Sequence, residues 1–326
     1  MATLVTTVTE TLRYRGKLGQ WAWVLHRISG LGTVLFLILH VVDTSWAAFA
    51  PEQYEQAIAE YQSPLFTIGE FFLVACVVYH AINGLRIAVL DYKPEWWGFQ
   101  QRAMLIVLVL TAIVLLPTFI GMAGHVIDHY NDDPEFVSIG EILETQAQFV
   151  IGFVVILVAA LALSAIYGAI SGSDKGMELP GRFEATLWSF MRISGILILP
   201  LVFGHLAMMH VIQGVFDITS TGTVVGTDIS NANGTAVEFV GARWDMLVAG
   251  VAIWRIYDGL LLALVVIHGF NGLRYVVNDY AHNPLFNRAL NWAIIFGAIA
   301  LIVVGMAALL AGVDETAAET ARQLME

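Results

Sequence analysis

The sequence predicts an all-α integral membrane protein with about seven transmembrane helices, and three observations support this. Hydrophobic residues make up 58% of the 326 residues, charged residues make up 13%, and the mean hydropathy is +0.75. Soluble domains average about 45–50% apolar and about 25% charged residues. Seven apolar runs approach or exceed the roughly 20 residues that a membrane-spanning helix needs. The third observation is that two long stretches of the chain resemble each other.

The expected spans are separated by turn-forming residues such as Pro51, Lys93-Pro94 and Asn283-Pro284. A polar stretch rich in Thr, Gly and Asn, from about Thr219 to Gly241, is expected to be an extramembrane loop. No short apolar segment with a small-residue cleavage site opens the chain, so no removable signal peptide is expected. The seven spans are expected at about 22–49, 66–90, 103–126, 148–170, 187–213, 247–277 and 288–311.

Basic and acidic residues fall on opposite sides of a seven-span arrangement. Cytoplasmic loops are rich in Lys and Arg, so the N-terminus is predicted in the cytoplasm and the C-terminus outside. The residues on the cytoplasmic side are Arg13, Arg15, Lys17, Arg27, Arg86, Lys93, Arg102, Lys175, Arg182, Arg192, Arg274 and Arg288. The opposite side carries Glu52, Glu55, Glu60, Asp132, Asp133, Glu135, Glu141 and Glu144, with Arg243 and Arg322 as its bases.

A histidine motif occurs twice with identical spacing. His80 and His268 are each followed by Gly at +4, Arg at +6, Asp at +11 and Tyr at +12. An earlier stretch is also repeated, since Arg27-Ile28-Ser29-Gly30 matches Arg192-Ile193-Ser194-Gly195 at an offset of 165. The same offset carries His40 onto His205, whereas the His80 motif is offset by 188 because of the polar insertion.

These repeats predict two parallel three-helix units. The first unit ends outside and the second begins inside, so an additional crossing must join them, and the unmatched span 148–170 supplies it. The predicted division is 1–127 for the first repeat, 128–183 for the linker with its crossing helix, and 184–326 for the second repeat.

Four of the histidines are expected inside the membrane at two depths. Ionisable groups there are costly and usually functional, although a neutral His can also bond to a backbone carbonyl. At 1.5 Å per residue, His40 and His205 lie roughly 20 Å from the interfacial Arg of their span, and His80 and His268 roughly 9 Å. This predicts a proximal pair, His80 with His268, and a distal pair, His40 with His205, which suits two stacked bis-histidine haems.

A zinc or di-metal site is the alternative for a four-histidine set. The separation into two layers and the lack of a neighbouring intramembrane carboxylate at ligand spacing count against it. The single cysteine, Cys76, excludes an internal disulfide and a Cys-based cluster. Glycines near the histidines allow close approach of either a flat macrocycle or a neighbouring helix.

At these residues the chain resembles the membrane-anchor cytochrome b of succinate:quinone oxidoreductase, respiratory complex II. The stretch His26 to Gly30 and the motif that runs from His80 to Asp91 resemble the first anchor subunit. His268 with Asp279-Tyr280 resembles the second anchor subunit. The chain would then be the two anchors fused, and the resemblance covers all but the linker span and the long loop.

The resemblance implies haem ligation by His80 and His268, and His40 and His205 resemble the added ligands of two-haem members. Two haems b are therefore expected. A flavoprotein with FAD and an iron–sulfur protein would dock on the cytoplasmic face of a bacterial or archaeal membrane, and electrons would pass through the clusters to quinone, with menaquinone favoured. Both succinate oxidation and fumarate reduction stay open. No nucleic-acid partner is expected, and a homo-oligomer of the complex is compatible with the sequence.

The family's proximal quinone site implies roles for Arg27, Asp279 and Tyr280, with Ser29 and Trp23 as further candidates. A phenol and a guanidinium can both hydrogen-bond to quinone carbonyls. The family has a quinone-binding Ser four residues before the Arg, where this chain has Trp23, which suggests an aromatic wall against the quinone ring. The alternative is that these residues are interfacial anchors and part of an aromatic belt. The first-copy Asp91-Tyr92 is expected to be structural.

A second polar group is expected near the outer end of the sixth span. Arg255 and Asp258 are three residues apart and are expected to meet on one helix face, with His210 nearby on the other repeat. Haem-propionate binding or a structural role is predicted for Arg255, and a distal quinone site is the alternative.

Two other functions remain as alternatives. Parallel repeats also occur in membrane transporters, whose sites use helices broken near the midplane; Pro117 and Pro200 do not correspond in the repeats. The other alternative is a haem-free scaffold that only anchors soluble partners. A reduced-minus-oxidised spectrum distinguishes all three.

Overall fold

The computed structural model describes residues 16–131, 138–172 and 175–325. Among these residues, seven helices are long and apolar enough to cross a membrane, which confirms the predicted all-α membrane fold. They are α2 (Leu18–Phe49), α4 (Pro64–Tyr92), α5 (Gln100–Asn131, preceded by the 3-10 helix η1, Pro94–Phe99), α6 (Ile139–Ser171), α7 (Gly181–Leu206), α9 (Ile253–Tyr280) and α10 (Pro284–Ala311).

The helix ends follow from local sequence. Pro284 stands in the first turn of α10, where its missing N–H is not needed, and the Asn283 side chain accepts from the amides of Leu285 and Phe286. Gly172 ends α6 with a left-handed φ of 62°. The sixth span begins at Ile253 instead of the expected 247, because residues 248–251 form a tight turn that contains Ala249 at φ 52° and Gly250.

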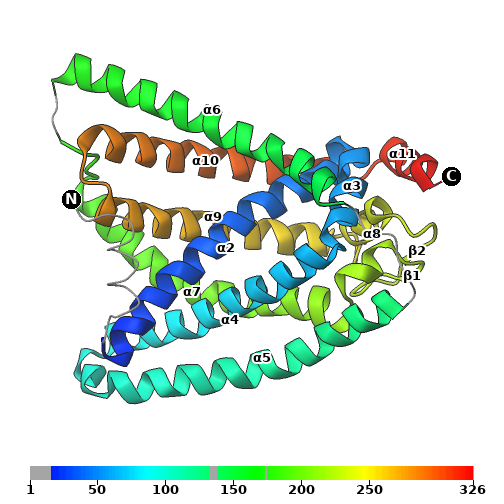
Figure 1. Ribbon diagram of the computed structural model, residues 1–326, viewed down its shortest axis with the longest axis horizontal. Helices are drawn as coiled ribbons and strands as arrows, with labels where there is room; N and C mark the ends of the chain where they lie inside the picture. The colour runs from blue at the N-terminus through cyan, green and yellow to red at the C-terminus, as the bar shows by residue number, and fades with distance from the viewer. Residues whose placement is uncertain (1–15, 132–137, 173–174, 326) are drawn as a thin grey trace.

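Four helices form the centre of the bundle. α2 packs against α4 and α9, and α7 packs against the same two helices. The remaining spans lie outside them: α5 against α4, α10 against α9 and α2, and α6 against α10 (Figure 1). The helices alternate in direction, so the described chain begins at one end of the bundle and finishes at the other (Figure 1).

A folded cap covers one end of the bundle, hereafter the capped end (Figure 1). The polar insertion that was expected to be a loop contains a short antiparallel hairpin and a helix whose residues Val237, Phe239 and Trp244 are buried. They pack with Tyr54 and Ile58. The cap consists of α3 (Pro51–Tyr61), the 3-10 helix η3 (Val215–Thr219), β1 (Gly222–Thr223), β2 (Ser230–Asn231), α8 (Ala236–Asp245) and α11 (Glu315–Met325).

Glu55 of α3 joins two parts of this cap. Its carboxylate accepts hydrogen bonds from the amides of Ala236 (3.0 Å) and Val237 (2.9 Å), which are unpaired donors in the first turn of α8. Burial raises the pKa of this carboxyl, and the two amide hydrogen bonds oppose the shift. Glu55 therefore holds a segment far away in sequence.

Glu55→Ala is expected to destabilise the cap by about 1–3 kcal/mol, because two amides lose a charged acceptor. The measurement is the thermal unfolding midpoint of the detergent-solubilised protein. Glu52→Ala, an exposed change on the same helix, is the matched control. Equal midpoints for the two variants would contradict the role of Glu55.

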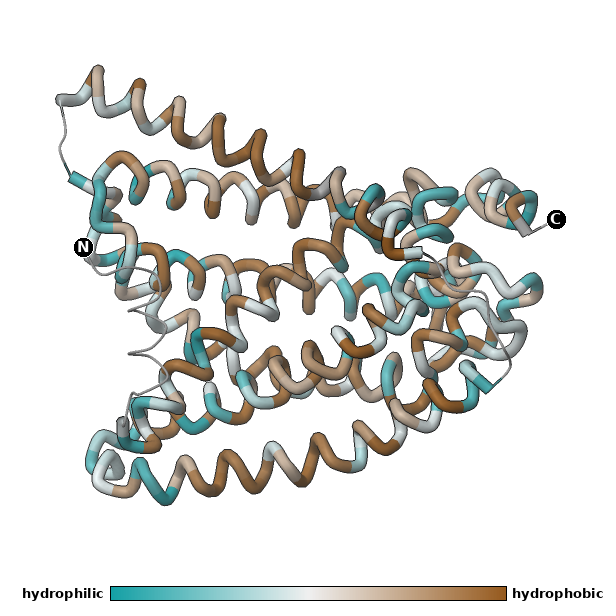
Figure 2. The backbone as a smooth tube through the Cα atoms, viewed as in Figure 1, coloured by the Kyte–Doolittle hydropathy of each residue, from teal (hydrophilic) through white to brown (hydrophobic). Residues whose placement is uncertain are grey.

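The outer faces of the helices are suited to lipid. Large apolar side chains such as Ile113, Leu116 and Ile120 on α5 are more than half exposed, and hydrophobic residues fill the middle of the spans while polar residues gather at the ends (Figure 2). The uncapped end carries Lys17, Lys93 and most of the other described bases of the predicted cytoplasmic side. Arg13, Arg15, Asp132, Asp133 and Glu135 lie outside the described residues.

Candidate functional site

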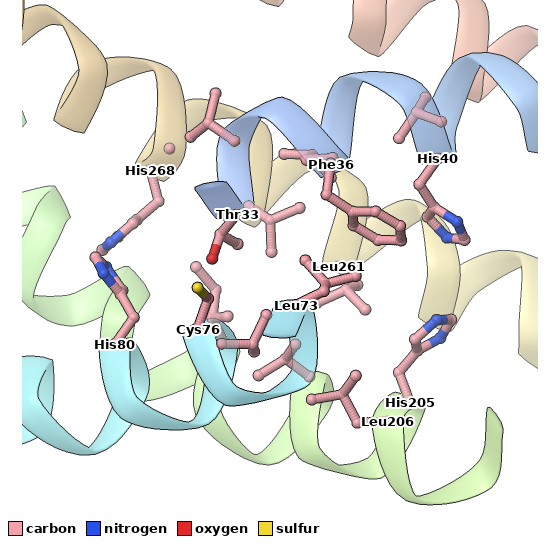
Figure 3. A pocket seen from close by; sticks show the side chains of 18 of the residues that line it. Thr33, Phe36, His40, Leu73, Cys76, His80, His205, Leu206, Leu261 and His268 are labelled. Carbon is pink, nitrogen blue, oxygen red and sulfur yellow. The ribbon is translucent and has the colours of Figure 1, made fainter. Parts of the chain in front are cut away.

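A cavity of about 1040 Å³ runs through the centre of the bundle between α2, α4, α7 and α9. All four histidines predicted as ligands line this cavity, although they come from four different helices. His80 and His268 point toward each other at one end, and His40 and His205 point toward each other at the other end (Figure 3). The structure thus brings together the proximal and distal pairs that the sequence predicts.

The proximal pair is held through its Nδ1 atoms. Nδ1 of His268 lies 2.9 Å from Oγ of Ser194, and Nδ1 of His80 lies 3.0 Å from the backbone oxygen of His26 and 3.4 Å from Oγ of Ser29. Metal-bound histidines usually use one ring nitrogen for the metal and the other for such a contact. Nε2 of each ring therefore remains for a ligand in the cavity.

Two glycines make room for these rings. A Cβ at Gly30 would lie 2.8 Å from Cε1 of His80, and a Cβ at Gly195 would lie 3.4 Å from Cε1 of His268. Both glycines belong to the repeated Arg-Ile-Ser-Gly stretch, so that motif supplies the serine contact and the space for the adjacent histidine. The ring of His26 stacks on His80 at 3.9 Å between centroids.

The distance between the two rings of the distal pair leaves room for one metal ion between them. The centroids of His40 and His205 are 5.9 Å apart, with an interplanar angle of 73°. Two metal–nitrogen bonds of about 2 Å each, plus the imidazole radii, require about 6 Å. Phe36 stacks beside His40 at 5.2 Å and, with Leu73 and Leu261, lies between the two pairs (Figure 3).

Buried polar atoms without a protein partner occur at both ends of this cavity. Nη1 of Arg27, Nδ1 of His26 and the hydroxyl of Tyr275 lie toward the uncapped end, and Nη2 of Arg243 lies toward the capped end. Carboxylates bind strongly to such donors, and haem b carries two propionates. The histidine pairs, the apolar wall and these unpartnered atoms therefore fit a bis-histidine haem at each depth.

The candidate quinone residues Trp23, Arg27, Asp279 and Tyr280 come together at the uncapped end. Arg27 forms an ion pair with Asp279, and its guanidinium lies 4.0 Å from the Trp23 ring and 5.8 Å from the Tyr280 ring. Trp23 and Tyr280 are 49% and 63% exposed, so a ligand can reach them. Ser29 does not join this group, because it is buried and its hydroxyl contacts His26 and His80.

A matching group forms from the other copies of the same residues. Arg192 forms an ion pair with Asp91 at 2.5 Å and lies 3.2 Å from the ring of Trp188. Tyr92 differs from Tyr280, because it is 82% exposed and packs under Nζ of Lys93 at 5.5 Å. The two groups thus share the ion pair and the tryptophan but differ in the tyrosine.

The expected Arg255–Asp258 pair is replaced by other contacts. Arg255 pairs with Asp245 at 2.5 Å and donates to the backbone oxygen of Trp244 at 2.6 Å, whereas Asp258 accepts from Nε1 of Trp244 at 3.4 Å. Arg255 therefore ties α9 to the cap, and the arginine that lines the cavity there is Arg243. Arg255 has these partners because α8 folds back over the end of α9.

His210 also lines the cavity and pairs with Glu70 of α4. It lies in the π-helix η2 (Ala207–Ile212), which follows directly on α7. A π turn inside a helix rotates the residues after it and often marks a functional position. His210 was predicted beside Arg255 as a haem-propionate or distal-quinone candidate, whereas in the structure the two residues have different ion-pair partners. Among the described residues, no group of three or more His, Cys, Asp or Glu could hold a metal ion.

Two residues of the cavity were missed by sequence reasoning. His26 was noted as part of a motif but not as a neighbour of His80, and Arg243 was counted only as a base of the outer side. The signal available for Arg243 is its place in the apolar run Phe239-Val240-Gly241-Ala242 and Trp244. An arginine in such a run is either paired or bound to a ligand.

Comparisons with known proteins find relatives of this chain among membrane subunits of succinate dehydrogenase. The chain is 33% identical over 135 residues to the succinate dehydrogenase 2 membrane subunit SdhC of Mycobacterium tuberculosis. The aligned region covers 40% of this chain and 99% of that protein. It is 28% identical over 106 residues to the succinate dehydrogenase hydrophobic membrane anchor subunit of Halobacterium salinarum. This aligned region covers 31% of this chain and 81% of that protein. No solved structure matches the chain.

The family model for the transmembrane subunit of succinate dehydrogenase and fumarate reductase matches residues 6–116 and 178–308, well over half of the chain. With its seven apolar helices, the chain belongs to the family of succinate dehydrogenase/fumarate reductase transmembrane subunits, the membrane anchors of respiratory complex II.

Proposed function

We propose that this chain is a fusion of two such anchors that binds two haems b and reduces quinone. Its partners are a flavoprotein with FAD and an iron–sulfur protein, which dock at the uncapped end on the cytoplasmic side of a bacterial or archaeal membrane. The electrons come from succinate through the partners' clusters, and the acceptor is menaquinone. The same arrangement also runs as a fumarate reductase when the potentials of the quinone and the dicarboxylates favour that direction.

The fusion is supported by two separate matches to one family model. The first match covers α2, α4 and about half of α5, and the second covers α7, α9 and nearly all of α10. α6 lies outside both matches and supplies the crossing that two parallel units require. The matched contacts of Ser29 with His80 and of Ser194 with His268 support the same repeat.

The docking side is supported by charge. Described bases at the uncapped end include Lys17, Lys93, Arg102, Lys175 and Arg182, and Lys/Arg-rich ends of membrane helices face the cytoplasm. The quinone candidates lie at the same end, so a docked iron–sulfur subunit would be near them.

The chain's own residues have two tasks in this mechanism. Haem, when bound, carries one electron at a time. The proximal pair would hold one haem and the distal pair the other, and the apolar side chains of the cavity would keep water out. Arg27 and Tyr280 donate hydrogen bonds to a quinone carbonyl, which stabilises the negative charge that develops as electrons arrive. The indole of Trp23 provides a flat apolar surface for the quinone ring.

The observation that carries this proposal is that four histidines from four helices form two facing pairs within one cavity. The test is a reduced-minus-oxidised spectrum of the purified complex together with extraction of the haem. We expect b-type bands and two haems for each copy of this chain. A complex without a b-type signal would leave only the scaffold or transporter alternatives.

Ser194→Ala is expected to weaken retention of the proximal haem by about 10–100-fold, the usual effect of removing a contact to the second nitrogen of a ligating histidine. The measurement is the rate at which haem transfers to an acceptor protein. Ser189→Ala, which removes a hydroxyl bonded to Ala185 on the same helix, is the control. Equal transfer rates for both variants would assign Ser194 a packing role only.

A further inference from the structure

Arg243 is a buried cation at the capped end of the cavity. It comes from α8, is 5% exposed, and lies beside the distal pair. Its guanidinium stacks on the ring of Trp254 at 4.4 Å, and Nη1 approaches Sδ of Met209 at 3.5 Å. Nη2 is buried without a hydrogen-bond partner.

Three carboxylates of this region have other hydrogen-bond or ion-pair partners, and Asp43, which lines the same cavity, is buried with both carboxylate oxygens unpartnered and forms no salt bridge to Arg243. Glu70 pairs with His210, and Asp245 pairs with Arg255. Asp258 interacts with Arg243 through its charge but accepts its hydrogen bond from Trp244. Within the described part of the chain, no carboxylate oxygen lies within 4.0 Å of a guanidinium nitrogen of Arg243, so Arg243 forms no salt bridge.

Such a position is unfavourable for an arginine on its own. Burial lowers the pKa of the Arg243 guanidinium, but an arginine keeps its charge in proteins. A buried charge needs a partner, and removing the partner of a buried ion costs several kcal/mol. The unpartnered Nη2 belongs to a side chain that lines the cavity, so an anion bound inside that cavity would supply its hydrogen-bond partner.

We propose that Arg243 binds a propionate carboxylate of the haem held by His40 and His205, and that its charge raises the reduction potential of that haem. This inference rests on the proposed function, because it needs the distal haem. Haem reduction adds one negative charge, which a fixed cation nearby favours. The folded insertion α8 therefore has a role beyond covering the bundle, since it supplies the anion partner of the distal site.

The test is a potentiometric titration of both haems in the purified complex. Arg243→Gln is expected to disfavour reduction of the distal haem by at least about tenfold, which is about 59 mV for a one-electron couple. Arg243→Lys keeps the charge and is expected to stay near the wild-type value. The matched control is Arg322→Gln, which removes a part-exposed cation of the same side from its pairs with Glu238 and Glu319.

Each result has a defined meaning. A distal potential in Arg243→Gln equal to that of the wild type, or an equal shift of both haems, would overturn the inference while the proposed function stands. If Arg243→Gln loses the distal haem, retention of that haem in Arg243→Lys supports binding of the propionate by the positive charge. Loss of the haem in both variants overturns the inference. A wild-type complex without the second haem would overturn the proposed function and this inference with it.

Discussion

His80→Ala and His268→Ala are each expected to remove the same haem, and His40→Ala and His205→Ala the other one. Each variant is expected to lose most of one haem, because it removes one of the two histidines that would hold that iron. The pairing follows from the side-chain directions in the cavity (Figure 3). The measurement is haem content per chain together with the potential at which the remaining haem titrates.

Added imidazole provides the matching control for this experiment. Each alanine variant leaves a space of the size of the deleted ring, so free imidazole is expected to restore the missing haem if the loss comes from ligation and not from misfolding. Spectra in which His40→Ala and His80→Ala remove the same haem would contradict the pairing. The proximal haem is expected to depend also on Ser194, because its hydroxyl contacts His268.

Tyr280→Phe is expected to lower the rate of quinone reduction by about 10²–10³-fold with both haems retained. Loss of one donor to an oxygen that gains negative charge has effects of this size. Arg27→Gln is expected to do the same and also to break the ion pair with Asp279. The measurement is succinate-driven reduction of a short-chain quinone, compared with an artificial acceptor that takes electrons directly from the soluble subunits.

The repeated motif offers a matched control for this variant. Tyr92 occupies the same position in the first copy but packs under Lys93 instead of near an arginine of the ion pair. Tyr92→Phe is therefore expected to leave quinone reduction unchanged. A loss of activity in Tyr92→Phe, or normal turnover in Tyr280→Phe, would contradict the assignment of the second copy to quinone.

The spans and the histidine depths could be predicted because both are properties of a linear pattern. A membrane helix must be apolar over a fixed length and satisfies its own backbone groups, so hydropathy alone finds the seven spans α2, α4, α5, α6, α7, α9 and α10. The depth of His40 or His80 follows from the rise per residue and the distance to an arginine at the interface. The repeat then indicates which histidines share a depth.

The cap could not be predicted in this way. The insertion is polar in composition, yet α8 buries Val237, Phe239 and Trp244 against Tyr54 and Ile58, which are far away in sequence. The amides at its start are paired by Glu55, a residue that carries no local signal for this role. Buried faces that depend on distant partners leave little periodic trace in a helix of ten residues.

The sequence by itself determined the number of spans, the two levels of the histidines along the bundle and the family of the chain, and it predicts the direction of the spans. Only the tertiary structure decided which way each side chain points: Ser29 toward His80 instead of quinone, Arg255 toward Asp245, and Arg243 into the cavity. The reason is physical. Position along a helix is fixed by the chain, whereas a side chain's partner depends on how each helix is rotated and on which distant segment packs against it.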